Sequence, residues 1–140
     1  MRTAIDTDII SALWVKEPTA GAARQALLRA RDEGSLAISP IVYAEICAHP
    51  GATPKFVDDF LRETAIEIDF ELDEEVWREA ARRFSRYAAR RRRSRGGSSK
   101  RLLADFIVAA HALTQADRLL TLDSGGFYRH DFPELKLLSV

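Results

Sequence analysis

The stretch "RTAIDTDIISALW" (residues 2–14) begins with a short apolar strand pattern that ends on a negative charge. Asp6 directly follows this pattern, and Asp8 comes two residues later, before an apolar helix pattern. A carboxylate at the end of a buried strand costs free energy unless another group compensates its charge. Asp8 has a simpler interpretation as the N-cap of the helix. The sequence must therefore supply a partner for Asp6 in particular.

Composition predicts one domain over residues 1–140. The mass is 15.7 kDa and 46% of the residues are hydrophobic, which suits a single core. The 21 basic and 21 acidic residues balance, but ten of the basic ones lie between Arg82 and Arg101, which indicates a local basic surface. A single cysteine, Cys47, excludes an intrachain disulfide. Because no apolar run is long enough for a membrane span or resembles a signal peptide, we expect a cytoplasmic protein.

Strand and helix patterns alternate along the chain. Apolar runs that fit strands lie at 2–6, 36–39, 66–72, 118–123 and 135–140, and helical patterns lie between them. Ser39-Pro40 and Thr53-Pro54 are typical starts of helices. This alternation predicts an α/β fold, with a central, mainly parallel β-sheet flanked by helices.

Four acidic residues stand out against this pattern. Asp6 and Asp123 each end a predicted strand, so both are expected at the carboxyl edge of the parallel sheet, where ligands bind. Glu45 is expected on a largely apolar helix face. Asp105 lies within the apolar segment "LLADFIVAAHALTQ" (residues 102–115), too far from its predicted start to be a cap and inside a helix expected to be buried.

Each acid also has a purely structural interpretation. Asp6 and Asp123 could be caps, Glu45 could be exposed, and Asp105 could form a salt bridge. Taken together, however, the four need a counter-charge, and the apolar segments that carry them contain no lysine or arginine. A divalent cation is the simplest partner, and hard oxygen ligands favour Mg²⁺ or Mn²⁺. Such a site can activate water and stabilise a phosphate oxygen, which predicts phosphodiester hydrolysis.

The chain resembles the PIN domain family, and within it the VapC toxins of toxin–antitoxin modules. The resemblance rests on "IDTDII" (5–10), "SPIVYAEI" (39–46), "LADFIVAAHAL" (103–113) and "RLLTLDSGGFYRHDFPELKLL" (118–138), in this order. It implies an endoribonuclease that uses Mg²⁺ or Mn²⁺, leaves 5′-phosphate and 3′-hydroxyl ends, often forms homodimers and is neutralised by an antitoxin. The family's acidic, metal-binding positions correspond to Asp6, Glu45, Asp105 and Asp123.

Other residues have supporting roles in this interpretation. Thr121 matches a hydroxyl often found near the family's site, and Asp8 falls at a variable position, where a helix cap or a group outside the metal shell is expected. The basic segment "RRRRSRGGSSKR" (90–101) departs from the family pattern, because it is more basic and richer in glycine than the family is in this region. We expect RNA phosphate contacts from this segment, although a solvated loop is the alternative. The residues concerned are Arg90, Arg91, Arg92, Arg93 and Arg95.

Two other function classes remain open at this point. "DTD" after a strand also fits the nucleophile and acid of a haloacid-dehalogenase-like aspartyl phosphatase, but no lysine lies near the later acids. A non-catalytic RNA- or protein-binding module would use the arginine segment and leave the four acids unexplained. Cys47 and His49 are too few for a zinc site, and His111 is expected to be structural.

Overall fold

The computed structural model describes residues 1–94 and 101–140. Within them, five parallel strands form one sheet in the order β3-β2-β1-β4-β5, which confirms the predicted α/β class. The strands are β1 (Arg2–Ile5), β2 (Ser35–Ile38), β3 (Ile66–Ile68), β4 (Arg118–Thr121) and β5 (Leu137–Ser139). The helices are α1 (Thr7–Val15), α2 (Ala20–Glu33), α3 (Pro40–Cys47), α4 (Pro54–Thr64), α5 (Glu74–Ser94), α6 (Leu103–Gln115) and α7 (Gly126–Asp131).

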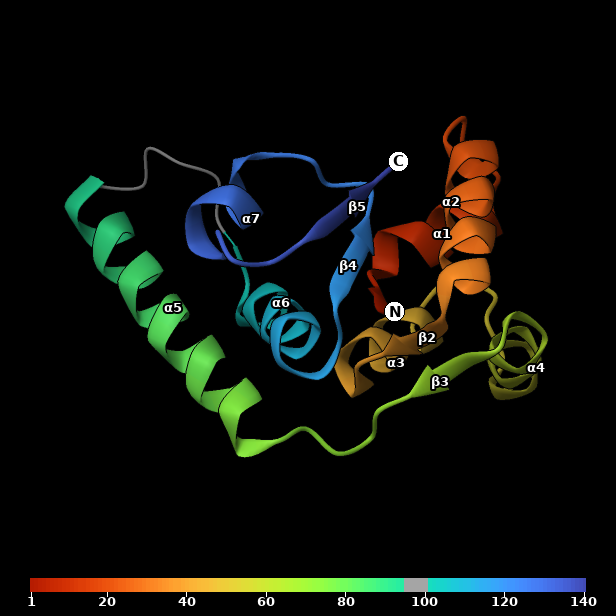
Figure 1. Ribbon diagram of the computed structural model, residues 1–140, viewed down its shortest axis with the longest axis horizontal. Coiled ribbons are helices and arrows are strands. Elements are labelled where there is room, and N and C mark those ends of the chain that lie inside the picture. The colour runs from red at the N-terminus through yellow and green to blue at the C-terminus, as the bar shows by residue number, and fades with distance from the viewer. Residues whose placement is uncertain (95–100) are drawn as a thin grey trace.

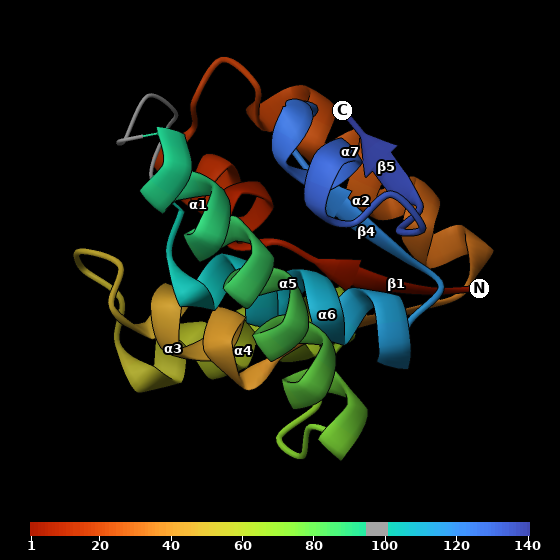
Figure 2. The same ribbon diagram turned by 90° about the vertical axis from the view of Figure 1, so that its left-hand side faces the viewer.

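Helices cover the two faces of the sheet (Figure 1). Helix α6 contacts β1 and β4 on one side and the long helix α5 on the other, so it separates α5 from the sheet. On the opposite face α1 contacts β4 and α2 contacts β2. The view from the side shows α5 lying across α6 (Figure 2). None of the helices in the described residues is long and apolar enough to cross a membrane.

Helix starts follow the capping rules that the sequence indicated, with one exception. Ser39 Oγ accepts from the Val42 amide at 3.2 Å, and Thr53 Oγ1 accepts from the Phe56 amide at 3.1 Å. Helix α1 is capped by Asp6, whose carboxylate accepts from the Thr7 amide at 2.8 Å. The interpretation of Asp8 as the N-cap was therefore wrong, because α1 begins one residue after Asp6.

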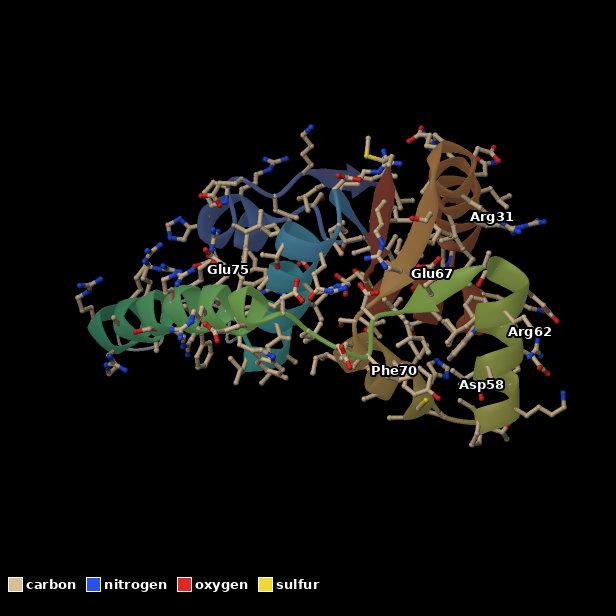
Figure 3. All side chains as sticks on the ribbon, turned by 60° about the horizontal axis from the view of Figure 1, so that its bottom comes forward. Arg31, Asp58, Arg62, Glu67, Phe70 and Glu75 are labelled. Atoms are coloured by element: carbon tan, nitrogen blue, oxygen red, sulfur yellow. The ribbon has the colours of Figure 1, made fainter. Side chains whose placement is uncertain are left out.

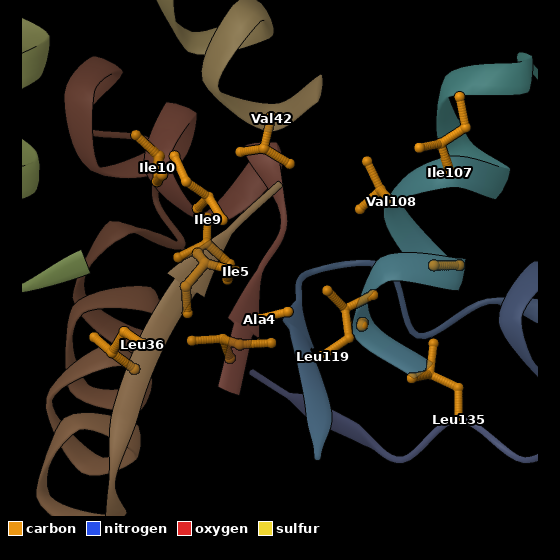
Figure 4. Close-up of a cluster of buried hydrophobic side chains, with 14 of the residues drawn as sticks. Ala4, Ile5, Ile9, Ile10, Leu36, Val42, Ile107, Val108, Leu119 and Leu135 are labelled. Atoms are coloured by element: carbon orange, nitrogen blue, oxygen red, sulfur yellow. The ribbon is translucent and has the colours of Figure 1, made fainter. Parts of the chain in front are cut away.

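The hydrophobic core lies where α1, α3 and α6 meet the central strands (Figure 4). Ile5 on β1, Leu36 on β2 and Leu119 on β4 are each at most 1% exposed. Ile9 of α1 and Val42 of α3 are fully buried against them. Burial of a large aliphatic side chain contributes roughly 1.5–3 kcal/mol, so this cluster fixes the positions of the strand ends that carry the acids.

Strand β1 lies at the point where the order of the sheet reverses. Ala4 pairs with Ala37 of β2 on one side and with Leu119 of β4 on the other. On one side of β1 the sheet continues with β2 and β3, and on the other side it continues with β4 and β5. In open parallel sheets, the carboxyl ends of the two strands at such a reversal form the usual binding crevice. Asp6 and Asp123 follow these two strands.

A partly buried polar network links β1 to the residue that follows the edge strand β3. Arg2 donates to both carboxylate oxygens of Asp69, at 2.8 and 2.7 Å, and a hydrogen bond of 2.8 Å joins His111 Nε2 to Asp69 Oδ2. Strand β3 ends at Ile68, earlier than the predicted 66–72, because Asp69 turns into this network. The Arg2 guanidinium lowers the pKa of Asp69, whereas burial lowers the pKa of His111.

The outer helices carry most of the exposed charge. Arg31 on α2 donates to the Glu63 carbonyl of α4 at 3.5 Å, which links these two helices. Figure 3 shows Arg31 and Arg62 on this side of the molecule, away from the C-terminal end of α5. Phe70, on the connection between β3 and α5, is 66% exposed.

The lowered pKa of His111 predicts a pH-dependent stability. Below the ordinary His pKa of 6.5 the unfolded chain binds a proton that the folded chain does not, so stability falls as the pH falls from this value toward the folded pKa. His111→Gln removes this titration. Urea unfolding at pH 7.5 and 5.5 should show the wild type losing up to about 1.4 kcal/mol more than the variant. His130→Gln, at an exposed histidine, should behave as the wild type, and equal losses in all three proteins would contradict the prediction.

Candidate active site

A cavity of about 300 Å³ opens beyond the carboxyl ends of β1 and β4. It is lined by residues of α1, α3, α6 and α7, by the residues that follow β1 and β4, and by Arg101, which precedes α6. The lining residues are Asp6, Thr7, Asp8, Ser11, Glu45, Arg101, Asp105, Val108, Asp123 and Tyr128. All four acids that the sequence singled out are among them, together with Asp8. Five carboxylates therefore share one cavity with a single guanidinium.

Asp6 is held in this cavity by neutral hydrogen-bond donors. Its Oδ2 accepts from the hydroxyls of Thr121 and Tyr128, each at 2.9 Å, and its Oδ1 accepts from the Thr7 amide. Burial raises the pKa of Asp6 against the effect of these three donors, and the nearby charge of Asp105 raises it further. Burial beside Asp6 also raises the pKa of the Tyr128 hydroxyl, which keeps this group a donor.

Asp8 is the acid that the sequence placed outside the site, yet it also lines the cavity. Its carboxylate accepts from the Leu122 amide at 3.2 Å and from the Thr121 hydroxyl at 3.1 Å. Burial, followed by the charge of Asp6, raises the pKa of Asp8 to about 6. Because the Thr121 hydroxyl has a single proton, Asp6 and Asp8 share one donor. Thr121 thus couples the ends of β1 and β4, and its own oxygen accepts from the Asp123 amide at 3.0 Å.

Glu45 and Asp105 reach the cavity from helices on its rim. Glu45 is an exposed residue, whereas the sequence predicted that it lies on a buried helix face, and its Oε1 accepts from the Thr7 hydroxyl at 2.7 Å. Partial burial of this carboxylate raises the pKa of Glu45, and the charges of Asp6 and Asp105 add to the effect. Asp105 lies in the first turn of α6 and accepts from the Leu102 amide at 3.0 Å. The interpretation that it is too far along the helix to be a cap was wrong, because α6 begins at Leu103.

Asp123 pairs with a basic residue, Arg101, which lies outside the apolar segments that carry the four acids. Arg101 lies between α5 and α6 in the chain, and its guanidinium is 3.2 Å from Asp123 Oδ2. The other oxygen, Oδ1, accepts from the Gly125 amide at 2.8 Å. In the sequence, Arg101 is only the end of the basic segment, and nothing in the local pattern indicates that it reaches Asp123.

The chemical nature of these side chains fits a divalent cation, but their present positions do not form a complete metal site. Carboxylate and hydroxyl oxygens are the ligands that Mg²⁺ and Mn²⁺ prefer, and five carboxylates beside one guanidinium leave negative charge to compensate. Within residues 1–94 and 101–140, however, no three His, Cys, Asp or Glu side chains are grouped closely enough to hold an ion. Several of these oxygens bond to protein donors instead. A cation would have to compete with Arg101 for Asp123.

The predicted RNA-contact arginines lie apart from the acidic cavity. Arg90 and Arg91 line a second cavity between α5 and α7, and Arg92 and Arg93 are in the last turn of α5, where they are exposed. Arg95 lies outside the described residues. The structure therefore separates a basic region on α5 from the acids at the sheet edge.

Residues 3–133 match the PIN domain family. The chain belongs to this family. Its predicted membership is thereby confirmed, and the alternative of a haloacid-dehalogenase-like phosphatase loses its support. No curated protein matches the chain in sequence.

Solved structures of low sequence identity share this PIN fold. VapBC2 from Rickettsia felis, bound to a promoter DNA fragment, is 20% identical with a TM-score of 0.72, covering 99% of this chain and 98% of that one. VapBC-1 from nontypeable Haemophilus influenzae is 18% identical with a TM-score of 0.68 and the same coverage. A toxin–antitoxin complex from Klebsiella pneumoniae is 18% identical with a TM-score of 0.57, covering 98% and 96%.

Asp8→Asn should stabilise the fold at neutral pH. The folded carboxyl has a pKa of about 6 against an ordinary 3.8, so keeping it charged at pH 7.5 costs up to about 3 kcal/mol. As the pH falls through 6 toward 4, the folded wild type binds a proton that the unfolded chain does not, and the advantage of the variant should disappear. Urea unfolding at pH 7.5 and 4 measures this difference.

Asp32→Asn is the matched control, because Asp32 is exposed on α2. This change should leave the free energy of unfolding within about 0.5 kcal/mol of the wild type. A loss of stability in Asp8→Asn at pH 7.5 would show that the Leu122 and Thr121 hydrogen bonds outweigh the charge.

Proposed function

We propose that this PIN domain chain is a metal-dependent endoribonuclease that acts as the toxin of a toxin–antitoxin pair. The observation that carries the proposal is the cavity at the reversal of the sheet, in which five carboxylates are accompanied by one arginine. A cavity of this charge does not suit a bare phosphodiester, whose negative charge it would repel. The cavity can bind a polyanion such as RNA only when a cation lies between its carboxylates and the phosphates.

Asp6, Glu45, Asp105 and Asp123 are the proposed ligands of Mg²⁺ or Mn²⁺. When bound, the cation supplies a Lewis acid that activates water and neutralises charge on the phosphodiester. The chain's own groups keep the ligands in place, since Thr121 and Tyr128 hold Asp6 and the Gly125 amide holds Asp123. Asp8 is not one of the proposed ligands, and it affects Asp6 through the Thr121 hydroxyl that both carboxylates share.

The proposed partners follow from the family and from the complexes of similar fold. We propose that the chain cleaves RNA to leave 5′-phosphate and 3′-hydroxyl ends, that it forms a homodimer and that a cognate antitoxin neutralises it. VapBC2, VapBC-1 and the Klebsiella pneumoniae toxin–antitoxin complex support a partner protein of this kind. We expect the protein to act in the cytoplasm, where its RNA substrate is found.

Loss of one proposed ligand should abolish cleavage without unfolding the protein. Asp6→Asn keeps an acceptor that can cap α1, so the fold should persist. Its rate of cleavage of bulk tRNA and ribosomal RNA in Mn²⁺ should fall at least about 100-fold, since the charge stabilisation from a catalytic metal is worth several kcal/mol. Denaturing gels measure the rate, and an exonuclease specific for 5′-phosphates identifies the product ends.

Asp32→Asn serves again as the control and should cleave at the wild-type rate. Chelation of the cation should stop the wild type to the same extent as the Asp6 change does. Undiminished cleavage by Asp6→Asn, or cleavage that persists in a chelator, would refute the proposed site. Binding of RNA with no cleavage under any of these conditions would favour the non-catalytic binding module instead.

A further inference from the structure

A second cavity, of about 480 Å³, lies between α5 and α7. Three of its lining residues are arginines, namely Arg90, Arg91 and Arg101, and one is an aspartate, Asp131. Phe127 and Tyr87 supply aromatic surface to its wall. This volume falls within the range of small-molecule sites, and the combination of guanidinium and aromatic groups is typical of sites for unpaired nucleotides.

Arg101 belongs to the walls of both cavities. It is fixed at three points, because its amide donates to the Tyr87 hydroxyl at 2.5 Å, its guanidinium pairs with Asp123, and the guanidinium carbon lies 4.6 Å from the centre of the Phe127 ring. Within the described part of the chain, Asp123 is the one hydrogen-bond acceptor of this guanidinium. Arginine carries five N–H donors, so most of them stay available for a phosphate.

Arg90 has a different position in the same cavity. Its guanidinium donates to Asp131 Oδ1 at 2.5 Å, and the Asp131 side chain is only 6% exposed. This pair neutralises Arg90 and joins α5 to α7, so it shapes the cavity wall. The charge closest to the acidic cavity is therefore that of Arg101.

We propose that the cavity between α5 and α7 seats the nucleotide that adjoins the scissile phosphate, and that Arg101 holds the phosphate between the two cavities. This inference rests on the proposed function, which supplies the RNA. A guanidinium backed by the Phe127 ring offers a flat cationic surface on which an unpaired base stacks. These aromatic and guanidinium groups favour a nucleotide over an acidic protein segment, because an acidic segment has no base to stack on them.

Nucleotide binding to the metal-free protein tests this inference without any need for cleavage. AMP titrated into the protein in EDTA, followed by amide NMR shifts of α7 and Arg101, should give saturable binding. Ribose 5-phosphate, which lacks the base, should bind more weakly. Arg101→Gln should weaken AMP binding at least about fivefold, because a charge-assisted hydrogen bond to phosphate is lost. Arg129 is an exposed arginine of α7 that does not line the cavity, so Arg129→Gln should bind AMP as the wild type does.

The inference would be overturned by the absence of a saturable shift, by equal AMP affinity in Arg101→Gln and wild type, or by equal affinity for AMP and ribose 5-phosphate. Octaglutamate that binds this cavity and is not displaced by AMP would overturn it too, and would assign the cavity to an acidic protein segment. A thermal melt checks that Arg101→Gln is folded. RNA cleavage without AMP binding leaves the proposed function standing, whereas AMP binding without cleavage leaves only the nucleotide cavity.

Discussion

The repulsion between carboxylates at the ends of β1 and β4 is the constraint on which this site depends. Asp6 and Asp8 share the hydroxyl proton of Thr121, and burial raises the pKa of both. The core beneath fixes the two strands side by side, so the acids cannot move apart without disrupting the sheet. Neutral donors such as Tyr128 make this arrangement tolerable but leave most of its charge uncompensated. A site that costs stability in this way is typical of function.

The sequence predicted much of the fold because the relevant information is local. Alternating apolar runs and the caps at Ser39 and Thr53 indicated the strands and helices, and the parallel order follows from their alternation. The presence of Asp6 and Asp123 at one edge of the sheet also follows, because all parallel strands end on the same side. What the pattern could not indicate is which strands are neighbours. The reversal of order at β1 depends on the pairing of β1 with β4, which is 115 residues away in the sequence.

The errors concern contacts between segments far apart in the sequence, and the register of helix starts. Asp105 seemed deep within its helix because the apolar run begins at Leu102, whereas in the structure its carboxylate bonds back to the Leu102 amide. Arg101 is 22 residues from Asp123, and no local pattern connects them. The counter-charge that the apolar segments lacked thus comes in part from the end of the basic segment. This arginine also lines both cavities, so Arg101 lies beside the acidic site, whereas the arginines at the end of α5 lie apart from it.

Anomalous scattering from crystals soaked in Mn²⁺ tests most directly whether a divalent cation binds among these acids. We predict a manganese peak within the cavity, in contact with Asp6 and Asp123, and a longer separation between Arg101 and Asp123 than the present 3.2 Å. The present lack of any group of three possible ligands among the described residues makes this rearrangement necessary. A saturating soak with no peak in the cavity, and with the Arg101–Asp123 pair intact, would show that these acids do not form a metal site.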